Sequence, residues 1–208
     1  MVVRGAADAV ARGAAVSLGI GNLARYHVSL RAREQAGVPS WRSAQGLTRV
    51  KWTRHVFETE GWLYAIQSLR NAITANTFLA STVLTLFGLS IGSLWKQKPS
   101  NLDVRATAQL VSAAGGLICS AYSFSQSARL MVHAGFMFPV AATDAEERAA
   151  VERIMVRSHL LQWGGWRWLY LSAWTATWVL GGEVAACAAS FALTAFLASE
   201  DRKPAPAT

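Results

Sequence analysis

The uncharged run NAITANTFLASTVLTLFGLSIGSLW, residues 71–95, decides the fold class. About 20 predominantly apolar residues in a helix are enough to cross the hydrocarbon core of a bilayer. A segment in that core must satisfy its backbone hydrogen bonds internally, which makes a helix the default. Three further runs carry no charge, at 106–128, 168–182 and 184–199. The sequence therefore predicts an integral membrane protein built of helices.

The overall composition agrees with this interpretation. Of the 208 residues, 52% are hydrophobic and 15% are charged, against about 25% charged residues in soluble domains. The formal net charge of +8 fits basic loops on the cytoplasmic face and anionic lipid headgroups better than nucleic acid. Membrane lipids are therefore the expected partners and nucleic acid is not. Cys119 and Cys187 both fall in apolar segments, where we expect small packing residues.

The apolar runs and their flanks predict the organisation of the chain. We expect an all-α bundle of four transmembrane helices that forms one domain over residues 1–200, followed by a disordered tail at 201–208. No internal repeat is visible. The expected membrane helices cover about 6–30, 62–95, 104–135 and 165–198, with an exposed helix at about 144–158.

Two parts of the chain allow more than one interpretation. Residues 6–30 contain Asp8 and Arg12, so they are either a marginal first membrane helix or an Arg- and Ala-rich transit peptide. Residues 31–62 mix basic and aromatic side chains. Such a segment either lies on the headgroup layer or forms a solvated loop with a few buried aromatics.

The last apolar stretch is too long for one straight crossing. Its 34 or so residues would span about 50 Å as a helix, against a hydrocarbon core of about 30 Å. Gly181, Gly182 and Glu183 interrupt it. We expect a kinked or strongly tilted helix; two half-membrane helices around the glycine pair are the less favoured alternative. Four crossings and the distribution of Lys and Arg place the connections 31–62 and 141–164 in the cytoplasm.

Two helices carry stripes of polar and small residues. In lipid, small residues allow helices to approach closely, and hydroxyl groups bond across the contact. The stripes therefore predict either a packing seam between the second and third membrane helices or a polar pathway or pocket there. On a projection of 100° per residue, the second-helix stripe is Gln67, Arg70, Asn71, Thr74, Phe78, Ser81, Thr85, Gly88 and Gly92. The third-helix stripe is Gln109, Ser112, Ala113, Gly116, Ser120, Ser123 and Ser127.

Charged residues near the membrane add a second candidate. Gln126, Arg129 and His133 share a face of the third helix. Arg129 either snorkels to the cytoplasmic surface or joins Arg70 and Arg167 in a basic pocket for a lipid headgroup or another anion.

Glu183 is the one acid deep in an apolar stretch. If the last crossing covers about 174–197, Glu183 lies well inside the membrane, where a carboxylate would handle an ion or a proton, or would form a salt bridge. If the crossing covers 166–188, Glu183 lies near the outer surface.

Enzyme motifs are scarce. The chain contains no HExxH, GxSxG or Cys–His metal spacing, and His27, His55, His133 and His159 are scattered. We therefore expect a protein that is not an enzyme and uses no cofactor or metal.

Several stretches resemble a known family. AIQSLRNAITANTFLASTVLTL, residues 65–86, is similar to the signature of domain-of-unknown-function family 599, small membrane proteins of plants, algae and bacteria, through Gln67, Arg70 and Asn71. YSFSQSARLMVHAGFM, residues 122–137, and GGWRWLYLSAWTATWVLGG, residues 164–182, resemble its third- and last-helix patterns. Thr74 differs from the Met expected there, and Gly182 from the Pro. The resemblance implies a four-helix membrane protein without an assigned activity.

Two functions follow as expectations. The first is a non-enzymatic membrane protein that transports a solute or binds a lipid or anion at the polar seam. The second is a structural or assembly subunit whose stripes are helix-packing seams. In this interpretation the subunit can form a homo-oligomer. The candidate ligand-binding residues are Gln67, Arg70, Asn71, Thr74, Gln126, Arg129, His133, Arg167 and Glu183.

Overall fold

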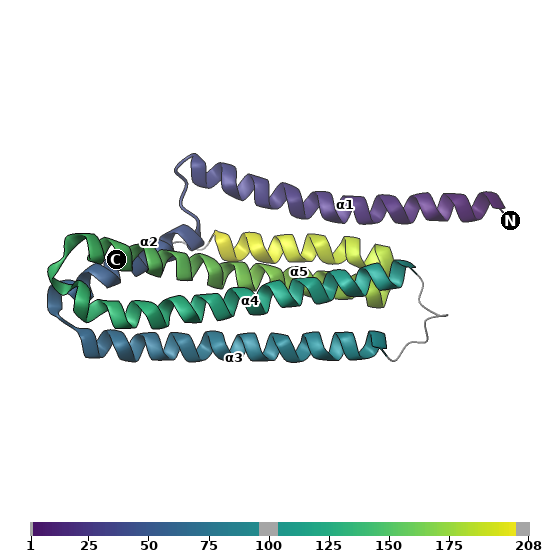
Figure 1. The fold of residues 1–208 in the computed structure, drawn as a ribbon. Helices are drawn as coiled ribbons and strands as arrows, with labels where there is room; N and C mark the ends of the chain where they lie inside the picture. The colour runs from purple at the N-terminus through teal and green to yellow at the C-terminus, as the bar shows by residue number, and fades with distance from the viewer. Residues whose placement is uncertain (1, 96–103, 203–208) are drawn as a thin grey trace. The chain divides into compact units, whose positions relative to one another are not determined.

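The computed structural model describes residues 2–95 and 104–202, and every regular element in these two ranges is helical. This confirms the all-α class. The predicted tail lies, from residue 203 onward, outside the described residues. The elements are α1 (Val2–Gln35), α2 (Trp41–Thr59), α3 (Trp62–Trp95), α4 (Val104–Val140), the short 3₁₀ helix η2 (Ala141–Thr143) and α5 (Ala145–Asp201) (Figure 1).

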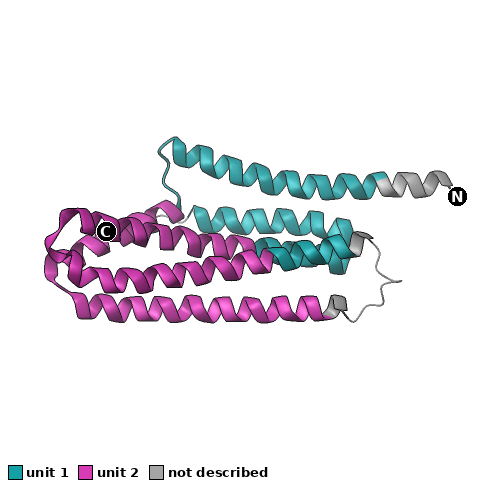
Figure 2. Ribbon diagram, in the orientation of Figure 1, with its two compact units in different colours: residues 1–41, 93–115, 170–208 teal, residues 42–92, 116–169 magenta. Residues whose placement is uncertain are grey.

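The chain divides into two compact units (Figure 2). Unit 1 comprises residues 1–41, 93–115 and 170–208, and unit 2 comprises residues 42–92 and 116–169. The long helices α4 and α5 each supply residues to both units, because one unit boundary falls inside each of them, after residue 115 and after residue 169.

An aromatic cluster fills one end of unit 2. Phe138 of α4 is fully buried, and its ring centroid lies 5.2 Å from that of Phe57 and 5.9 Å from that of Trp52, both on α2. Aromatic rings at such distances stabilise each other beyond the area that they bury. The cluster anchors α2, so the connection expected at 31–62 to be a headgroup segment or a solvated loop contains a packed helix.

The charged start of α5 is amphipathic rather than exposed all round. Val151 is fully buried, and Met155 is 3% exposed in the core of unit 2. The segment 144–158, expected to form an exposed helix, is thus the start of α5 and buries one of its faces. Val151, Met155 and Ser158 follow the spacing of one helix face, while Glu146, Arg153 and Arg157 keep the other side polar.

In unit 1, α5 reverses direction at Gly182. The interruption expected at the glycine pair is present, since Gly182 has φ 74° and ψ −167°, a conformation that glycine adopts without a steric penalty. The chain turns back instead of bending (Figure 1, green to yellow). Trp174 Nε1–H donates a 2.7 Å hydrogen bond to the carbonyl of Ala186, whereas 12 residues of straight helix would separate them by about 18 Å.

The hairpin continues beyond the turn. The ring centroids of Tyr170 and Phe196 lie 5.7 Å apart, although a straight helix would place them about 39 Å apart. Gly181 also cannot carry a side chain without a shift, because an added Cβ would lie 2.5 Å from the Cβ of Ala185. The single kinked crossing expected over 165–198 is therefore an antiparallel pair of helical limbs.

The helix α1 packs on the second limb of this hairpin. An added Cβ at Gly19 would lie 3.4 Å from the Trp174 ring and 3.6 Å from the Cα of Cys187. The Asn22 amide donates to the Ser190 carbonyl at 3.2 Å and to Thr194 Oγ1 at 3.0 Å. The helix expected at 6–30 is thus present, with longer bounds.

Two of the described helices are long and apolar enough to cross a membrane: α3 over Trp62–Gly92, and α5. In each, only 17% of the most apolar window is buried inside the structure. The core helix of a soluble protein would bury most of that surface.

Candidate functional site

The predicted stripe on α3 faces away from the core of unit 2. The core side of the helix carries Ala65, Leu69, Asn76, Ala80 and Val83, all buried. The stripe lies on the opposite side of the helix, so it takes no part in the packing of unit 2. Its exposed members are Gln67, Arg70, Asn71, Thr74, Phe78, Ser81, Thr85 and Gly88.

The stripe on α4 is largely buried, and within unit 2 it contacts α5. Ser120 is fully buried, and its hydroxyl donates to the carbonyl of Gly165 at 2.8 Å. Ser127 donates to the carbonyl of Ser158 at 2.9 Å. An added Cβ at Gly165 would lie 2.8 Å from the ring of Phe124. Within unit 2, the small and hydroxyl residues of the α4 stripe therefore form a closed contact with α5, while the α3 stripe faces away from it.

One polar side chain of α3 does reach this contact. Asn76 is fully buried, and its amide nitrogen lies 3.1 Å from the Ala72 carbonyl and 3.5 Å from Ser127 Oγ. Its Oδ1 is buried and accepts no hydrogen bond from the described residues. Sequence analysis missed Asn76, although its spacing from Leu69 and Ala80 places it on the apolar face.

The other predicted site residues lie in several environments. On α4, Arg129 is exposed and its Nε donates to Gln126 Oε1 at 2.9 Å, while His133 is exposed. On α5, the Arg167 guanidinium lies 4.7 Å from the ring centroid of Trp163, a cation–π contact. Glu183 belongs to unit 1, is 8% exposed and follows the glycine turn.

A polar contact that sequence analysis did not identify joins α2 to α5. His159 is 2% exposed, and its Nε2 lies 3.0 Å from the carbonyl of Arg42. A carbonyl only accepts hydrogen bonds, so Nε2 carries the proton and Nδ1 has a free lone pair. Nδ1 is buried and has no partner among the described residues. An added Cβ at Gly46 would lie 3.5 Å from the ring, so a glycine permits the close approach.

Arg49 lies at the same contact. One of its guanidinium nitrogens, Nη2, donates to Gln162 Oε1 at 2.7 Å. No acidic side chain among the described residues forms an ion pair with Arg49. Burial removes water from this guanidinium and lowers its pKa from the usual value. Burial also lowers the pKa of His159 to about 4, and the positive charges of Arg49 and Arg42 act in the same direction. His159 is consequently neutral at physiological pH.

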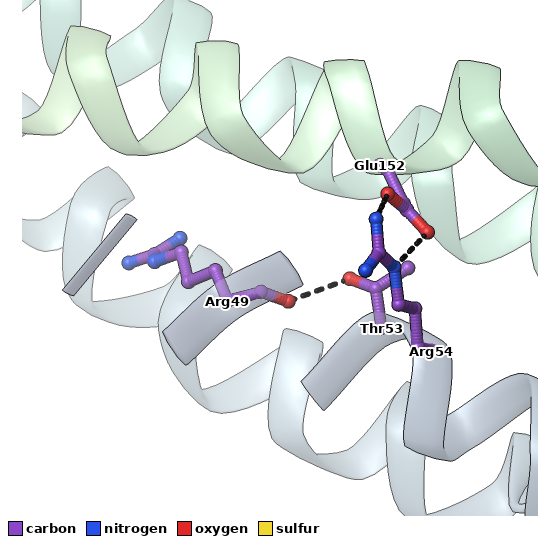
Figure 3. Close-up of polar contacts among 4 residues, drawn as sticks. All are labelled: Arg49, Thr53, Arg54 and Glu152. Atoms are coloured by element: carbon purple, nitrogen blue, oxygen red, sulfur yellow. Dashed lines mark hydrogen bonds and ion pairs between the residues drawn. The ribbon is translucent and has the colours of Figure 1, made fainter. Parts of the chain in front are cut away.

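The next turn of α2 shows the opposite arrangement. Arg54 forms two hydrogen bonds with the Glu152 carboxylate, at 2.8 and 2.9 Å, and the Arg49 side chain points away from this pair (Figure 3). The hydrogen bonds and the charge of Glu152 raise the pKa of Arg54. Within unit 2, α2 therefore presents one arginine to a carboxylate and another to a neutral amide.

The sequence did carry a signal for this contact. Arg42, Gly46, Arg49 and Thr53 follow the spacing of one helix face, but we interpreted their segment as a connection. The partner of His159 is a backbone carbonyl, which no side-chain motif can reveal. Among the described residues, no group of three His, Cys, Asp or Glu side chains is placed to hold a metal ion.

Comparison with known proteins identifies a family. No curated protein and no solved structure matches the chain. The model of one family, described as "Protein of unknown function, DUF599", matches residues 14–205. That range covers most of the chain, including the α3 stripe, the α4–α5 contact and the α2–α5 contact. The chain therefore belongs to the DUF599 family.

Proposed function

We propose that this chain is a multi-pass membrane protein with a structural role, whose buried polar contacts hold its helices together. The observation that carries the proposal is the outward direction of its apolar side chains. Leu89 is 68% exposed on α3, Phe136 75% on α4 and Leu180 87% on α5. Apolar surface spread over long helices in this way is covered by lipid more readily than by water.

The hairpin in α5 supports two crossings in place of one. The limbs 165–181 and 183–201 are about 26 and 28 Å long as helices, close to the hydrocarbon thickness of about 30 Å. The first limb would enter the bilayer, and the second would return to the same side. We propose the cytoplasm for that side, because the connections 31–62 and 141–164 together with their flanks carry more Arg and Lys than the opposite face. Tyr26, near the end of α1, donates a hydrogen bond to Asp201 at the end of the second limb, as this topology requires.

The closed α4–α5 contact favours a structural role over transport. A solute pathway needs polar groups that line water, whereas Ser120, Ser127 and Ser158 are fully buried and bonded across the contact. In lipid such bonds and close approaches stabilise helix pairs. We propose no enzymatic activity.

The outward stripe of α3 supports assembly with a second copy. In hydrocarbon, polar side chains that face lipid cost free energy, and a stripe of small residues allows close helix contact. Ser81 and Thr85 lie on this stripe. A second copy of the chain would cover both stripes at once, since a two-fold interface uses the same patch twice.

Cysteine cross-linking in membranes tests the assembly. In a background with Cys119→Ala and Cys187→Ala, Ser81→Cys should form a disulfide-linked dimer on mild oxidation. Leu86→Cys is the matched control: it is 43% exposed but lies about 140° around the helix from Ser81. Equal cross-linking of the two variants, or none from Ser81→Cys, contradicts the α3 interface.

Two further measurements test the rest of the proposal. The chain should stay in the membrane pellet after alkaline carbonate extraction, and its release would contradict membrane insertion. Purified protein in liposomes should pass no ions or solutes under an imposed gradient; a flux that Ser127→Leu abolishes would instead favour transport along the α4–α5 contact.

A further inference from the structure

The contact between α2 and α5 has an imbalance of charge. Arg54 is matched by Glu152 in a two-bond ion pair, although both side chains reach solvent. Arg49, more deeply placed, has the neutral amide of Gln162. Removing an unpaired guanidinium from water costs free energy, and an anion beside it recovers part of that cost.

The guanidinium of Arg49 keeps donors for such an anion. It has five N–H groups in a planar fork, and Gln162 accepts from one nitrogen. The other guanidinium nitrogens of Arg49 form no hydrogen bond with the described residues, and none of them is completely buried. Arginine forks suit the geometry of phosphate oxygens, to which they donate two parallel hydrogen bonds.

His159 is buried in the same α2–α5 contact and adds no charge there. Its Nε2–H is used by the Arg42 carbonyl. Trp163, one turn along α5, lies 6.5 Å from the His159 ring, and the Arg167 guanidinium lies 4.7 Å from the Trp163 ring centroid. An aromatic ring beside a basic side chain is typical of the headgroup level of membrane proteins.

The position along α5 points to the same level. Residues before His159 are highly charged, and from Trp168 to Gly182 no charge occurs. Arg49, Gln162 and Trp163 therefore lie where α5 changes from polar to apolar, which is the height of lipid phosphates if this helix enters a bilayer.

We propose that Arg49, Gln162 and Trp163 form a binding site for a phosphate-bearing anion, with Arg49 as its principal ligand. This binding site goes beyond the structural role proposed above. Only the assignment of a lipid as the source of the phosphate rests on the proposed membrane function. An anionic phospholipid headgroup and free inorganic phosphate share the required chemistry.

Binding to purified full-length protein in a neutral detergent tests the proposal. The probes are dioctanoyl phosphatidylglycerol, inorganic phosphate and, as the control without net charge, the zwitterionic dioctanoyl phosphatidylcholine, whose choline group masks its phosphate. Wild-type protein should bind phosphatidylglycerol at least tenfold more tightly than phosphatidylcholine, with an affinity that falls as salt rises. Binding of phosphatidylglycerol alone assigns a lipid headgroup, and similar binding of inorganic phosphate assigns phosphate in general; binding of neither overturns the proposal.

Two substitutions locate the site. Arg49→Gln should weaken phosphatidylglycerol binding about tenfold or more, the loss of a charged bidentate contact. Gln162→Glu keeps the shape of the side chain and gives Arg49 a carboxylate, so it should weaken binding at least as much while the protein stays folded. It therefore remains a test even if Arg49→Gln fails to fold.

The matched control is Arg54→Gln, on the same helix but already paired with Glu152. It should leave binding within about twofold of wild type. Equal affinities of wild type and Gln162→Glu, or an equal loss in Arg54→Gln, overturn the site. Carbonate extraction reports membrane insertion separately, so the two proposals can fail independently.

Discussion

The polar stripes of α3 and α4 look alike in the sequence and have opposite environments in the structure. Both combine hydroxyl residues with glycine at helical spacing. On α4, Ser120 and Ser127 are fully buried against α5. On α3, Ser81 and Thr85 are exposed, and Thr85 donates to the Ser81 carbonyl of its own helix. A Ser or Thr hydroxyl can donate its hydrogen bond to a carbonyl of its own helix. Its presence alone therefore does not show which side of a helix packs against another helix.

The difference arises from what lies on the other side of each helix. Opposite its stripe, α3 offers Leu69, Ala80 and Val83, which pack into the core of unit 2. On α4, the core residues Leu117 and Phe124 lie beside the stripe, and Ala113 of the stripe is itself buried. The stripe of α4 therefore shares a side with the apolar contact residues, and that of α3 does not.

The largest expected effect comes from filling the buried stripe. Ser127→Leu removes the bonds to Ser158 and forces a larger side chain into a contact without space. Lost hydrogen bonds and overpacking together should lower the free energy of unfolding by about 3–4 kcal/mol. Denaturant titration of the purified protein in micelles measures this effect. A loss below about 1 kcal/mol would mean that the α4–α5 contact is looser than the structure shows.

Acid should weaken a second buried polar contact. The pKa of His159 is lowered to about 4 in the folded protein, against about 6.5 when unfolded. Between these values the unfolded chain binds the proton and the folded chain does not, so stability falls as pH decreases from about 6.5 to 4. The loss is at most about 3 kcal/mol.

Two variants isolate this effect. His159→Gln retains a donor for the Arg42 carbonyl and does not titrate, so its stability should depend less on pH over that range. His133 is exposed, and His133→Gln should leave the pH dependence of the wild type unchanged. Unfolding midpoints measured every half unit from pH 7 to pH 4 distinguish the three proteins. An identical acid dependence of wild type and His159→Gln would exclude His159 as its cause.

Sequence alone could predict the elements better than their contacts. The uncharged runs located α3 and the last apolar stretch, and the glycine pair located the interruption in α5. The direction of the chain after Gly182 could not be predicted, since a glycine permits both a kink and a reversal. The hairpin depends on tertiary contacts such as the Trp174–Ala186 hydrogen bond.

The candidate site was harder to predict for a related reason. Periodicity shows that α3 has two different faces, but in a membrane either face can be the packed one. The basic residues of 31–62 concealed α2, because only Thr53, Val56 and Phe57 of that helix are buried. The partners of Arg49 and His159 are an amide and a backbone carbonyl, which no charge pattern reveals.

The turn between the hairpin limbs should be sensitive to one methyl group. Gly182→Ala places a side chain at φ 74° and ψ −167°, a backbone region essentially confined to glycine that costs another residue about 1–3 kcal/mol. The thermal midpoint in micelles should fall accordingly. Gly88→Ala is the control, because that glycine lies on the exposed α3 stripe with no atom within 4 Å of an added Cβ. Equal midpoints for the two variants would contradict the strained turn.

The smallest expected effect concerns the exposed stripe itself. Ser81→Leu adds an apolar side chain at a position outside the core of unit 2, so the stability of the isolated protein in micelles should change by about 0.5 kcal/mol or less. The same substitution should prevent the second copy from approaching in a membrane, because a large side chain replaces a small one at the proposed interface. Oligomer size in native gels should therefore change although the unfolding midpoint does not. A destabilisation near that of Ser127→Leu would place Ser81 in an internal contact and remove the distinction between the two stripes.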